Sequence, residues 1–253
     1  MAIAVSTWAQ FLAAYENNED GTIELMADID ANDDIPKRNY EKPMAKTING
    51  NGHTIYNIST GVVLNSPIFR GAYALTFNNT NFYNVYRIEN QVVFWSSNTY
   101  RTQFNDCKIV GRGLQYISEN ASFNRCSFSW SGVTSVAAGS ALSFYNSWLK
   151  IDFNRAANST STYFGTLNNS YIEGKFTQTA EGTFSVKLAN ALESSVINIE
   201  TTATNSTFPS GNVSVYNKTK QPNFTDSGNC VGVTDEQMKN AEYLAGVGFN
   251  IVT

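Results

Sequence analysis

A six-residue pattern of apolar, polar, polar, small, polar and apolar positions returns along the middle of the chain. Its occurrences are residues 77–82, 104–109, 123–128, 144–149, 167–172 and, less regularly, 192–197. They begin 19 to 27 residues apart, a spacing typical of solenoid proteins, in which each repeat packs on the next. The runs are short and rich in aromatic and β-branched residues, which favours strands over helices. Each occurrence therefore predicts one strand and corner of a stacked coil.

The small fourth position of this pattern is Cys107 in one coil and Cys126 in the next. Neighbouring coils lie about 4.8 Å apart, so we expect a column of small buried side chains that Thr80, Ser147 and Ser170 extend. This spacing also leaves a disulfide between Cys107 and Cys126 open. The chain has three cysteines, and an odd number implies no closed disulfide framework.

Both ends of the chain predict short helices that cap the solenoid. Thr7 and Gln10 have the spacing of a capping box, and so do Thr234 and Gln237. The second helix is expected to end just before Gly246, its C-cap. Helices at these positions would cover sheet edges that otherwise pair with other chains.

The remaining segments complete the expected order of elements. Residues 22–29 predict a first strand, residues 30–46 a long charged loop, and residues 248–252 a final strand. The predicted organisation is a single domain, residues 1–253, made of an N-terminal cap (1–46), stacked coils (47–220) and a C-terminal cap (221–253).

Two segments near the N-terminus resemble right-handed parallel β-helix proteins of the pectin-lyase-like superfamily. They are Thr22-Ile23-Glu24-Leu25 and Ile48-Asn49-Gly50-Asn51-Gly52-His53-Thr54-Ile55. The resemblance, which the later coils extend over most of the chain, implies an all-β, right-handed, single-stranded parallel β-helix solenoid with short capping helices at both ends. The superfamily includes pectin-active enzymes, tailspikes, adhesins and structural parts, so the fold alone leaves the function open.

Composition and charge argue against two classes of protein, those that bind nucleic acid and those that span a membrane. The chain of 253 residues has a net charge of −4, and charged residues make up only 15%. Nucleic-acid binding needs a basic face, so this class is not expected. No apolar run approaches the length of a membrane span, and the first residues predict no signal peptide.

Candidate catalytic residues do not form a recognisable group. His53, the only histidine, lies in the glycine-rich corner and is expected to be structural. Polysaccharide hydrolases need two close carboxylates, but the carboxylates of the coil region are dispersed. Lyases of this fold use a basic residue beside an acidic calcium cluster. No clustered carboxylates accompany the basic candidates Arg101, Lys108, Arg112 and Arg125.

Metal and cofactor sites are not predicted. Asp28, Asp30, Asp33 and Asp34 could hold calcium, but their spacing does not match an EF-hand loop. A solvated acidic loop is the alternative. One histidine and separated cysteines also argue against zinc.

Aromatic side chains are the remaining candidates for a binding site. Phe104, Phe123 and Phe144 share one position of the pattern and are expected to form a core stack. The candidate ligand-binding residues are Trp95, Trp130 and Trp148, of which the last two could face outward. They would then serve as a platform for a glycan. The alternative is that they pack in the core or at an interface.

We therefore expect a non-enzymatic structural or attachment component of a phage virion, such as a fibre, spike or capsid decoration protein. An asparagine-rich chain without a signal peptide is similar to bacteriophage virion proteins, assembled in the host cytoplasm. Tailspikes of this fold usually trimerise, so the expected partners are two further copies, other virion proteins and a host surface glycan. The alternatives are a carbohydrate-binding module and a polysaccharide hydrolase or lyase. No cofactor is expected.

Overall fold

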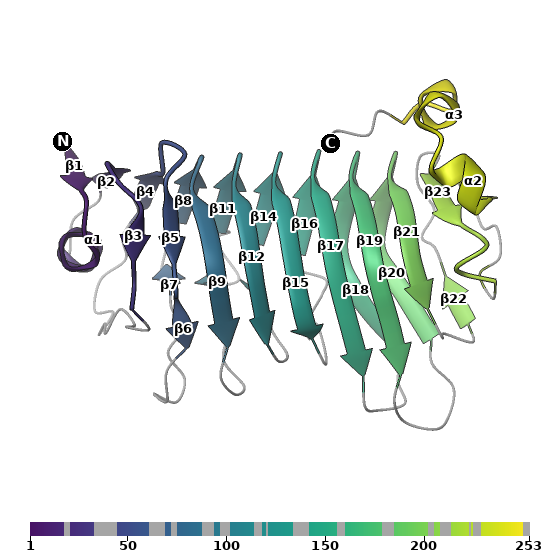
Figure 1. Ribbon diagram of the computed structural model, residues 1–253, viewed down its shortest axis with the longest axis horizontal. Coiled ribbons are helices and arrows are strands. Elements are labelled where there is room, and N and C mark those ends of the chain that lie inside the picture. The colour runs from purple at the N-terminus through teal and green to yellow at the C-terminus, as the bar shows by residue number, and fades with distance from the viewer. Residues whose placement is uncertain are drawn as a thin grey trace. The chain divides into compact units, whose positions relative to one another are not determined.

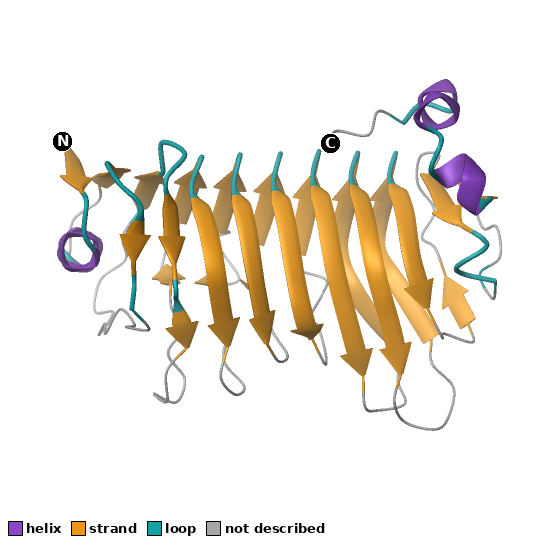
Figure 2. Cartoon of the chain, viewed as in Figure 1, coloured by secondary structure: helices purple, strands orange, loops and turns teal. Residues whose placement is uncertain are grey.

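The computed structural model describes residues 1–17, 21–32, 45–60, 69–71, 75–87, 94–96, 102–113, 118–119, 121–133, 142–155, 160–178, 185–201, 205–207, 214–222, 224 and 229–249. Most of these lie in strands, and the helices lie near the ends of the chain (Figure 2). The chain forms two compact units, Met1–Ser127 and Phe128–Thr253. Each is built from parallel strands of a β-solenoid.

In the first unit, successive coils add strands to two main parallel sheets (Figure 1). Sheet A has the order β1 (Ala2–Val5), β2 (Gly21–Leu25), β4 (Lys46–Asn49), β8 (Leu75–Asn78), β11 (Thr102–Asn105) and β14 (Ala121–Asn124). Sheet B has the order β3 (Ile29–Asp30), β5 (Thr54–Tyr56), β9 (Asn81–Arg87) and β12 (Lys108–Gly113), with β6 (Ser59–Thr60) also on β9. A short third sheet has the order β7 (Phe69–Gly71), β10 (Phe94–Ser96) and β13 (Ser118–Glu119).

The register of sheet A places equivalent side chains directly above one another. Phe77 pairs with Phe104, which pairs with Phe123. Their rings are fully buried and stack with centroids 5.1 and 4.7 Å apart. The expected core stack of Phe104 and Phe123 is confirmed, with Phe77 as an additional member. Phe144 belongs to the second unit, where its buried ring meets the edge of Phe128.

In the coils that carry the six-residue pattern, a residue with left-handed backbone geometry forms the corner between sheet A and sheet B. In the first unit it is Asn79, Asp106 and Arg125, with φ of 45°, 55° and 52°. This geometry is costly for most residues and least so for glycine, asparagine and aspartate. It always falls at the third position of the six-residue pattern, which explains why that position is polar and often asparagine.

The fourth position carries the predicted column of small side chains. Thr80, Cys107 and Cys126 are buried, and each hydroxyl or thiol donates to the carbonyl two residues earlier, at 3.0, 3.2 and 3.4 Å. Both cysteines are thiols, with no disulfide between them. A hydrogen bond with the Cys126 thiol, together with burial, raises the pKa of Cys107.

The second unit repeats this plan with longer strands. β15 (Ser127–Val133) leads into it. Its sheet A has the order β16 (Leu142–Tyr145), β18 (Thr160–Asn168), β20 (Ser185–Glu193) and β22 (Asn205–Thr207). Its sheet B has the order β17 (Trp148–Arg155), β19 (Tyr171–Gln178), β21 (Val196–Thr201), β23 (Ser214–Asn217) and β24 (Cys230–Val233).

The small-residue column of the second unit consists of serines. The backbone N–H groups of Ser147, Ser170 and Ser195 donate to the serine hydroxyl of the following coil at 3.2, 3.2 and 3.1 Å. The last acceptor is Ser214. Each hydroxyl of the first three also donates to the carbonyl two residues earlier. The column therefore satisfies buried backbone groups as well as filling space.

The N-terminal helix, α1 (Trp8–Glu16), begins at Thr7, whose side chain accepts from Gln10 N at 3.3 Å. The predicted N-cap is confirmed, but the capping box is incomplete, because Gln10 Oε1 accepts from Ser6 N instead of Thr7 N. At the other end, the buried Lys46 of β4 donates from Nζ to Ala14 O at 3.0 Å and also to Asn17 Oδ1. A cation at a helix C-terminus is favourable, so these bonds of Lys46 stabilise the packing of α1 against sheet A.

The C-terminal helix is divided, which differs from the prediction. The Thr234–Gln237 capping box is confirmed, with both of its hydrogen bonds present. However, α2 (Asp235–Met238) ends after four residues, and Asn240 caps a second helix, α3 (Ala241–Gly246). Asparagine favours N-cap positions over helix interiors, which explains the break.

The all-β parallel solenoid with short helices near both ends is confirmed. Two details differ from the prediction. The segment predicted as one strand, residues 22–29, is divided between β2 in sheet A and β3 in sheet B, because the chain turns a corner between them. The segment predicted as a final strand is not a strand at Gly248 and Phe249, and its other residues lie outside the described part.

Candidate binding surface

The tryptophans predicted as a platform lie in different environments. Trp130 is only 2% exposed and stacks on Phe128, with ring centroids 5.7 Å apart. It follows Phe128 by two residues in β15, so both side chains point to the same, inner face. Trp130 therefore lies in the core and offers no ring to a ligand at the surface. Trp95 lies in β10, but its side chain is outside the described part of the structure.

Trp148 faces outward but is partly covered. It begins β17 and pairs in register with Tyr171 of β19. Tyr171 is itself partly buried, because it packs against an apolar cluster that includes Val196 and Leu244. Of the three tryptophan candidates, only Trp148 has a described side chain on the outer face.

The C-terminal arm, residues 234–249, packs on this outer face of the second unit. Met238, Leu244 and Phe249 of the arm pack with Val196 and Val215. Each of these five side chains is at least 95% buried. The outer face of β21 and β23 is therefore occupied by the chain itself at these positions.

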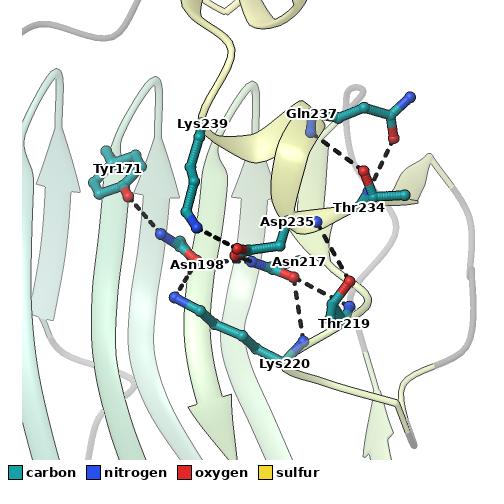
Figure 3. A network of polar contacts seen from close by, with 9 residues as sticks. All are labelled: Tyr171, Asn198, Asn217, Thr219, Lys220, Thr234, Asp235, Gln237 and Lys239. Atoms are coloured by element: carbon teal, nitrogen blue, oxygen red, sulfur yellow. Dashed lines mark hydrogen bonds and ion pairs between the residues drawn. The ribbon is translucent and has the colours of Figure 1, made fainter.

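A polar network holds the arm beside this apolar cluster (Figure 3). Asp235 at the start of α2 accepts a hydrogen bond from Asn217 Nδ2 at 2.9 Å and forms an ion pair with Lys239. Asn217 also donates to Asn198 Oδ1 at 3.0 Å, and Lys220 Nζ donates to the same oxygen at 3.1 Å. The bonds from Lys239 and Asn217 lower the pKa of Asp235 below its usual 3.8.

The outer face of sheet B in the first unit is different, because its side chains are polar or aromatic. In β3, β5 and β9, which lie side by side (Figure 1), the buried residues Ile29, Ile55 and Phe82 pair in register. The residues on either side of them point outward and are exposed or half-buried. We call this set, with the first residue of β12, the outer grid: Asp28, Asp30, Thr54, Tyr56, Asn81, Tyr83 and Lys108.

Tyr83 is the most prominent member of the outer grid. It is 59% exposed, the highest value among the large apolar and aromatic side chains that the structure describes in strands. It pairs in register with Tyr56, which pairs with Asp30. Among described residues, the hydroxyl of Tyr83 has no hydrogen-bond partner. The grid therefore presents an aromatic ring with an available polar tip.

The first coil of the grid is fixed by hydrogen bonds to its two carboxylates. Asp28 Oδ1 accepts from Thr54 N at 2.8 Å and lies 3.3 Å from Nδ1 of His53. Asp30 Oδ1 accepts from Asn32 N at 2.8 Å and from Asn57 Nδ2 at 3.0 Å. These contacts give the two carboxylates a structural role, and they place the ring of His53 beside Asp28.

A short amide ladder borders the grid on one side. Asn84 donates from Nδ2 to Asn57 Oδ1 at 2.7 Å, and Asn57 donates to Asp30. Asn57 and Asn84 have left-handed backbone geometry, with φ of 56° and 53°. Because each amide of the ladder donates towards the N-terminal coil, Asn84 Oδ1 is left as an acceptor beside Tyr83.

The basic residues weighed for lyase chemistry lie in different environments. Arg125 donates from Nε and an Nη to the two carboxylate oxygens of Asp106, both at 2.7 Å. This pair lowers the pKa of Asp106. Lys108, at the C-terminal side of the grid, makes no ion pair with any described residue. Arg101 is not described.

Metal binding has no support within the described ranges, where no group of three or more His, Cys, Asp or Glu side chains could hold an ion. Of the four aspartates weighed for calcium, Asp33 and Asp34 lie outside these ranges. Among the helices that the structure describes, none is long and apolar enough to cross a membrane.

Sequence reasoning missed the outer grid, although one signal for it was present. Tyr83 follows the last apolar residue of its six-residue pattern, Phe82, and alternation then places it outside. The same rule places Trp130 inside, because it lies two residues after Phe128. The in-register pairing of Asp30 with Tyr56 had no such signal, because a loop of unpredicted geometry separates the two coils.

Comparison with known proteins gives two similarities. Residues 2–123, which include every member of the outer grid, match the family described as "Putative pectate lyase-like adhesive domain". No curated protein matches the chain. The crystal structure of "a putative immunoglobulin A1 protease from Bacteroides ovatus" is similar with a TM-score of 0.47 and 11% sequence identity, over 97% of this chain and 87% of that chain.

Proposed function

We propose that this protein is an adhesive β-helix protein that binds a surface through the outer grid of its first unit. The observation that carries the proposal is the exposure of Tyr83 on a sheet face whose other members are polar residues and the half-buried Tyr56. Exposed tyrosines are enriched in recognition sites, because the ring supplies contact area and the hydroxyl supplies a hydrogen bond. A solenoid presents such residues from successive coils on one continuous face.

The comparison with known families supports this proposal. The matched family is described as an adhesive domain, and the match spans the coils that build the grid. The chemistry of the face also favours binding over catalysis. Asp28 and Asp30 both accept hydrogen bonds from backbone N–H groups, and the described residues include no group of three or more side chains that could hold a metal ion.

The setting in which the protein acts is a finer part of the proposal. We propose an attachment component of a phage virion, such as a fibre, spike or decoration protein. Its partners would be other virion proteins and a host surface glycan, and its assembly a homotrimer. The asparagine-rich sequence and the resemblance to tailspike-type solenoids support this setting.

Light scattering on the purified chain tests the assembly. A homotrimer should have a native mass of three times 27.9 kDa, and the mass of a monomer would contradict the trimer.

Binding of fluorescently labelled protein to a panel of intact bacterial cells tests the adhesive role. The wild type should label some of these cells, and Tyr83→Ala should reduce the labelling. Tyr145→Ala is the matched control, because Tyr145 is a half-buried tyrosine on sheet A of the second unit. Equal labelling by the wild type and Tyr83→Ala would overturn a role for the grid.

A further inference from the structure

We propose that the ligand of the outer grid is a saccharide whose pyranose ring stacks on Tyr83. This inference rests on the proposed adhesive function and names the chemical class that the grid would recognise. A pyranose ring has C–H groups on its faces and hydroxyls around its edge. A site for it therefore needs an exposed aromatic face with hydrogen-bonding groups beside it, and the grid has both.

Tyr83 supplies the aromatic face. Its backbone pairs in register with Tyr56 of β5, and the residue before it, Phe82, is fully buried and pairs with both β5 and β12. The ring therefore projects from a rigid strand rather than from a loop. A rigid aromatic side chain loses little conformational entropy on binding, which favours a small ligand that offers few contacts.

Hydrogen-bonding groups lie next to Tyr83 in sequence or two residues away in the register of the same face. Asn84 Oδ1 is an acceptor left open by the amide ladder, and the hydroxyl of Thr54 has no partner among the described residues. Asn81 donates to Gly52 O at 2.8 Å, which fixes its amide and leaves its oxygen as an acceptor. Lys108 pairs in register with Asn81 and adds an exposed ammonium donor.

The same composition disfavours a protein partner. The core of a protein interface is depleted in charged residues and is formed by apolar and aromatic side chains. The grid places the exposed Tyr83 and the half-buried Tyr56 among Asp28, Asp30 and Lys108, and the described side chains of its strands include no exposed aliphatic residue. Sugar hydroxyls, in contrast, can both donate to the carboxylates and amides and accept from the ammonium group.

The experiment is a screen of purified protein on an array of oligosaccharides and bacterial surface polysaccharides, followed by calorimetry on any saccharide bound. Tyr83→Ala should weaken binding about tenfold, the loss of one aromatic contact of roughly 1.4 kcal/mol. Tyr83→Phe should retain much of the affinity, because it keeps the ring. Tyr145→Ala should bind like the wild type, and circular dichroism should show all three variants folded.

The outcomes separate this inference from the adhesive function. Saccharide binding that depends on the Tyr83 ring supports both. Cell labelling that depends on Tyr83 but survives periodate oxidation of the cell-surface glycans would overturn the saccharide and retain the adhesive face. Equal saccharide affinity of the wild type and Tyr83→Ala would overturn the outer grid as the saccharide site. If the two proteins also label cells equally, the proposed adhesive role of the grid is overturned as well.

Discussion

The indole of Trp130 stacks on the ring of Phe128 within the core, with centroids 5.7 Å apart and planes inclined by 10°. Trp130→Ala should therefore leave a large cavity and reduce the free energy of unfolding by about 3–5 kcal/mol. Trp148→Ala should cost less, because Trp148 is only half-buried. Urea unfolding followed by circular dichroism compares the two. A larger loss for Trp148→Ala would contradict the placement of Trp130 in the core.

This pair also shows what the sequence could and could not predict. The six-residue pattern predicted the coils, the phenylalanine stack and the column of small residues, because each reflects a spacing that repeats. The direction of Trp130 was left open between the core and the surface, because the left-handed corner restarts the alternation of side chains. Counting from Phe128 instead of across the corner gives the observed direction.

The outer grid depends on information that no local pattern carries. Asp30 and Tyr56 lie 26 residues apart in sequence, yet they pair in register. Their register depends on the geometry of the intervening chain as well as on the hydrophobic pattern, and that geometry has no local signal in the sequence. The division of the C-terminal helix, in contrast, had a local signal in Asn240, a residue that favours N-caps.

The column of small residues predicts which cysteine substitutions are tolerated. Serine fills the position of Cys126 at Ser147, Ser170 and Ser195, where its hydroxyl donates to the carbonyl two residues earlier. Cys126→Ser should therefore change the free energy of unfolding by less than about 1 kcal/mol. Cys126→Val, which is bulkier and has no donor, should cost about 1–3 kcal/mol. Equal losses in urea unfolding would contradict a hydrogen-bonding role for this position.

Gly174 is expected to be the least replaceable glycine of the second unit among those described. Its φ of 144° is rarely adopted by other residues, and an added Cβ would lie 1.9 Å from the carbonyl oxygen of Ile151. Gly174→Ala should lower the melting temperature by several degrees, about 2–4 °C for each kcal/mol lost. Gly246→Ala is the control, because nothing lies within 4 Å of its added Cβ. Similar melting temperatures for both variants would contradict this close contact.

The attachment of the C-terminal arm should depend on pH through Asp235. Bonds from Lys239 and Asn217 lower its pKa in the folded protein. A carboxylate whose pKa is lower in the folded than in the unfolded protein stabilises the fold at pH values above its unfolded pKa, here the usual 3.8. This contribution is lost as the pH falls through the pKa of the folded protein. Stability should thus decrease below about pH 4. Asp235→Asn should weaken this dependence, because its amide cannot titrate.

Urea midpoints measured across this pH range provide the check. Glu242→Gln is a suitable control, because Glu242 is an exposed carboxylate of α3 with no hydrogen bond to a described residue. It should retain the wild-type dependence. The role of Asp235 would be refuted by an Asp235→Asn profile that overlays the wild type throughout.

Hydroxyl-radical footprinting tests the binding role of the outer grid most directly, because it reports the exposure of individual side chains. The protein would be oxidised alone and while bound to the bacterial cells that it labels. Oxidation of Tyr83 should fall on binding, while that of Tyr145 should stay unchanged. Protection of Tyr145 or of the C-terminal arm, with Tyr83 oxidised as in the unbound protein, would contradict the account.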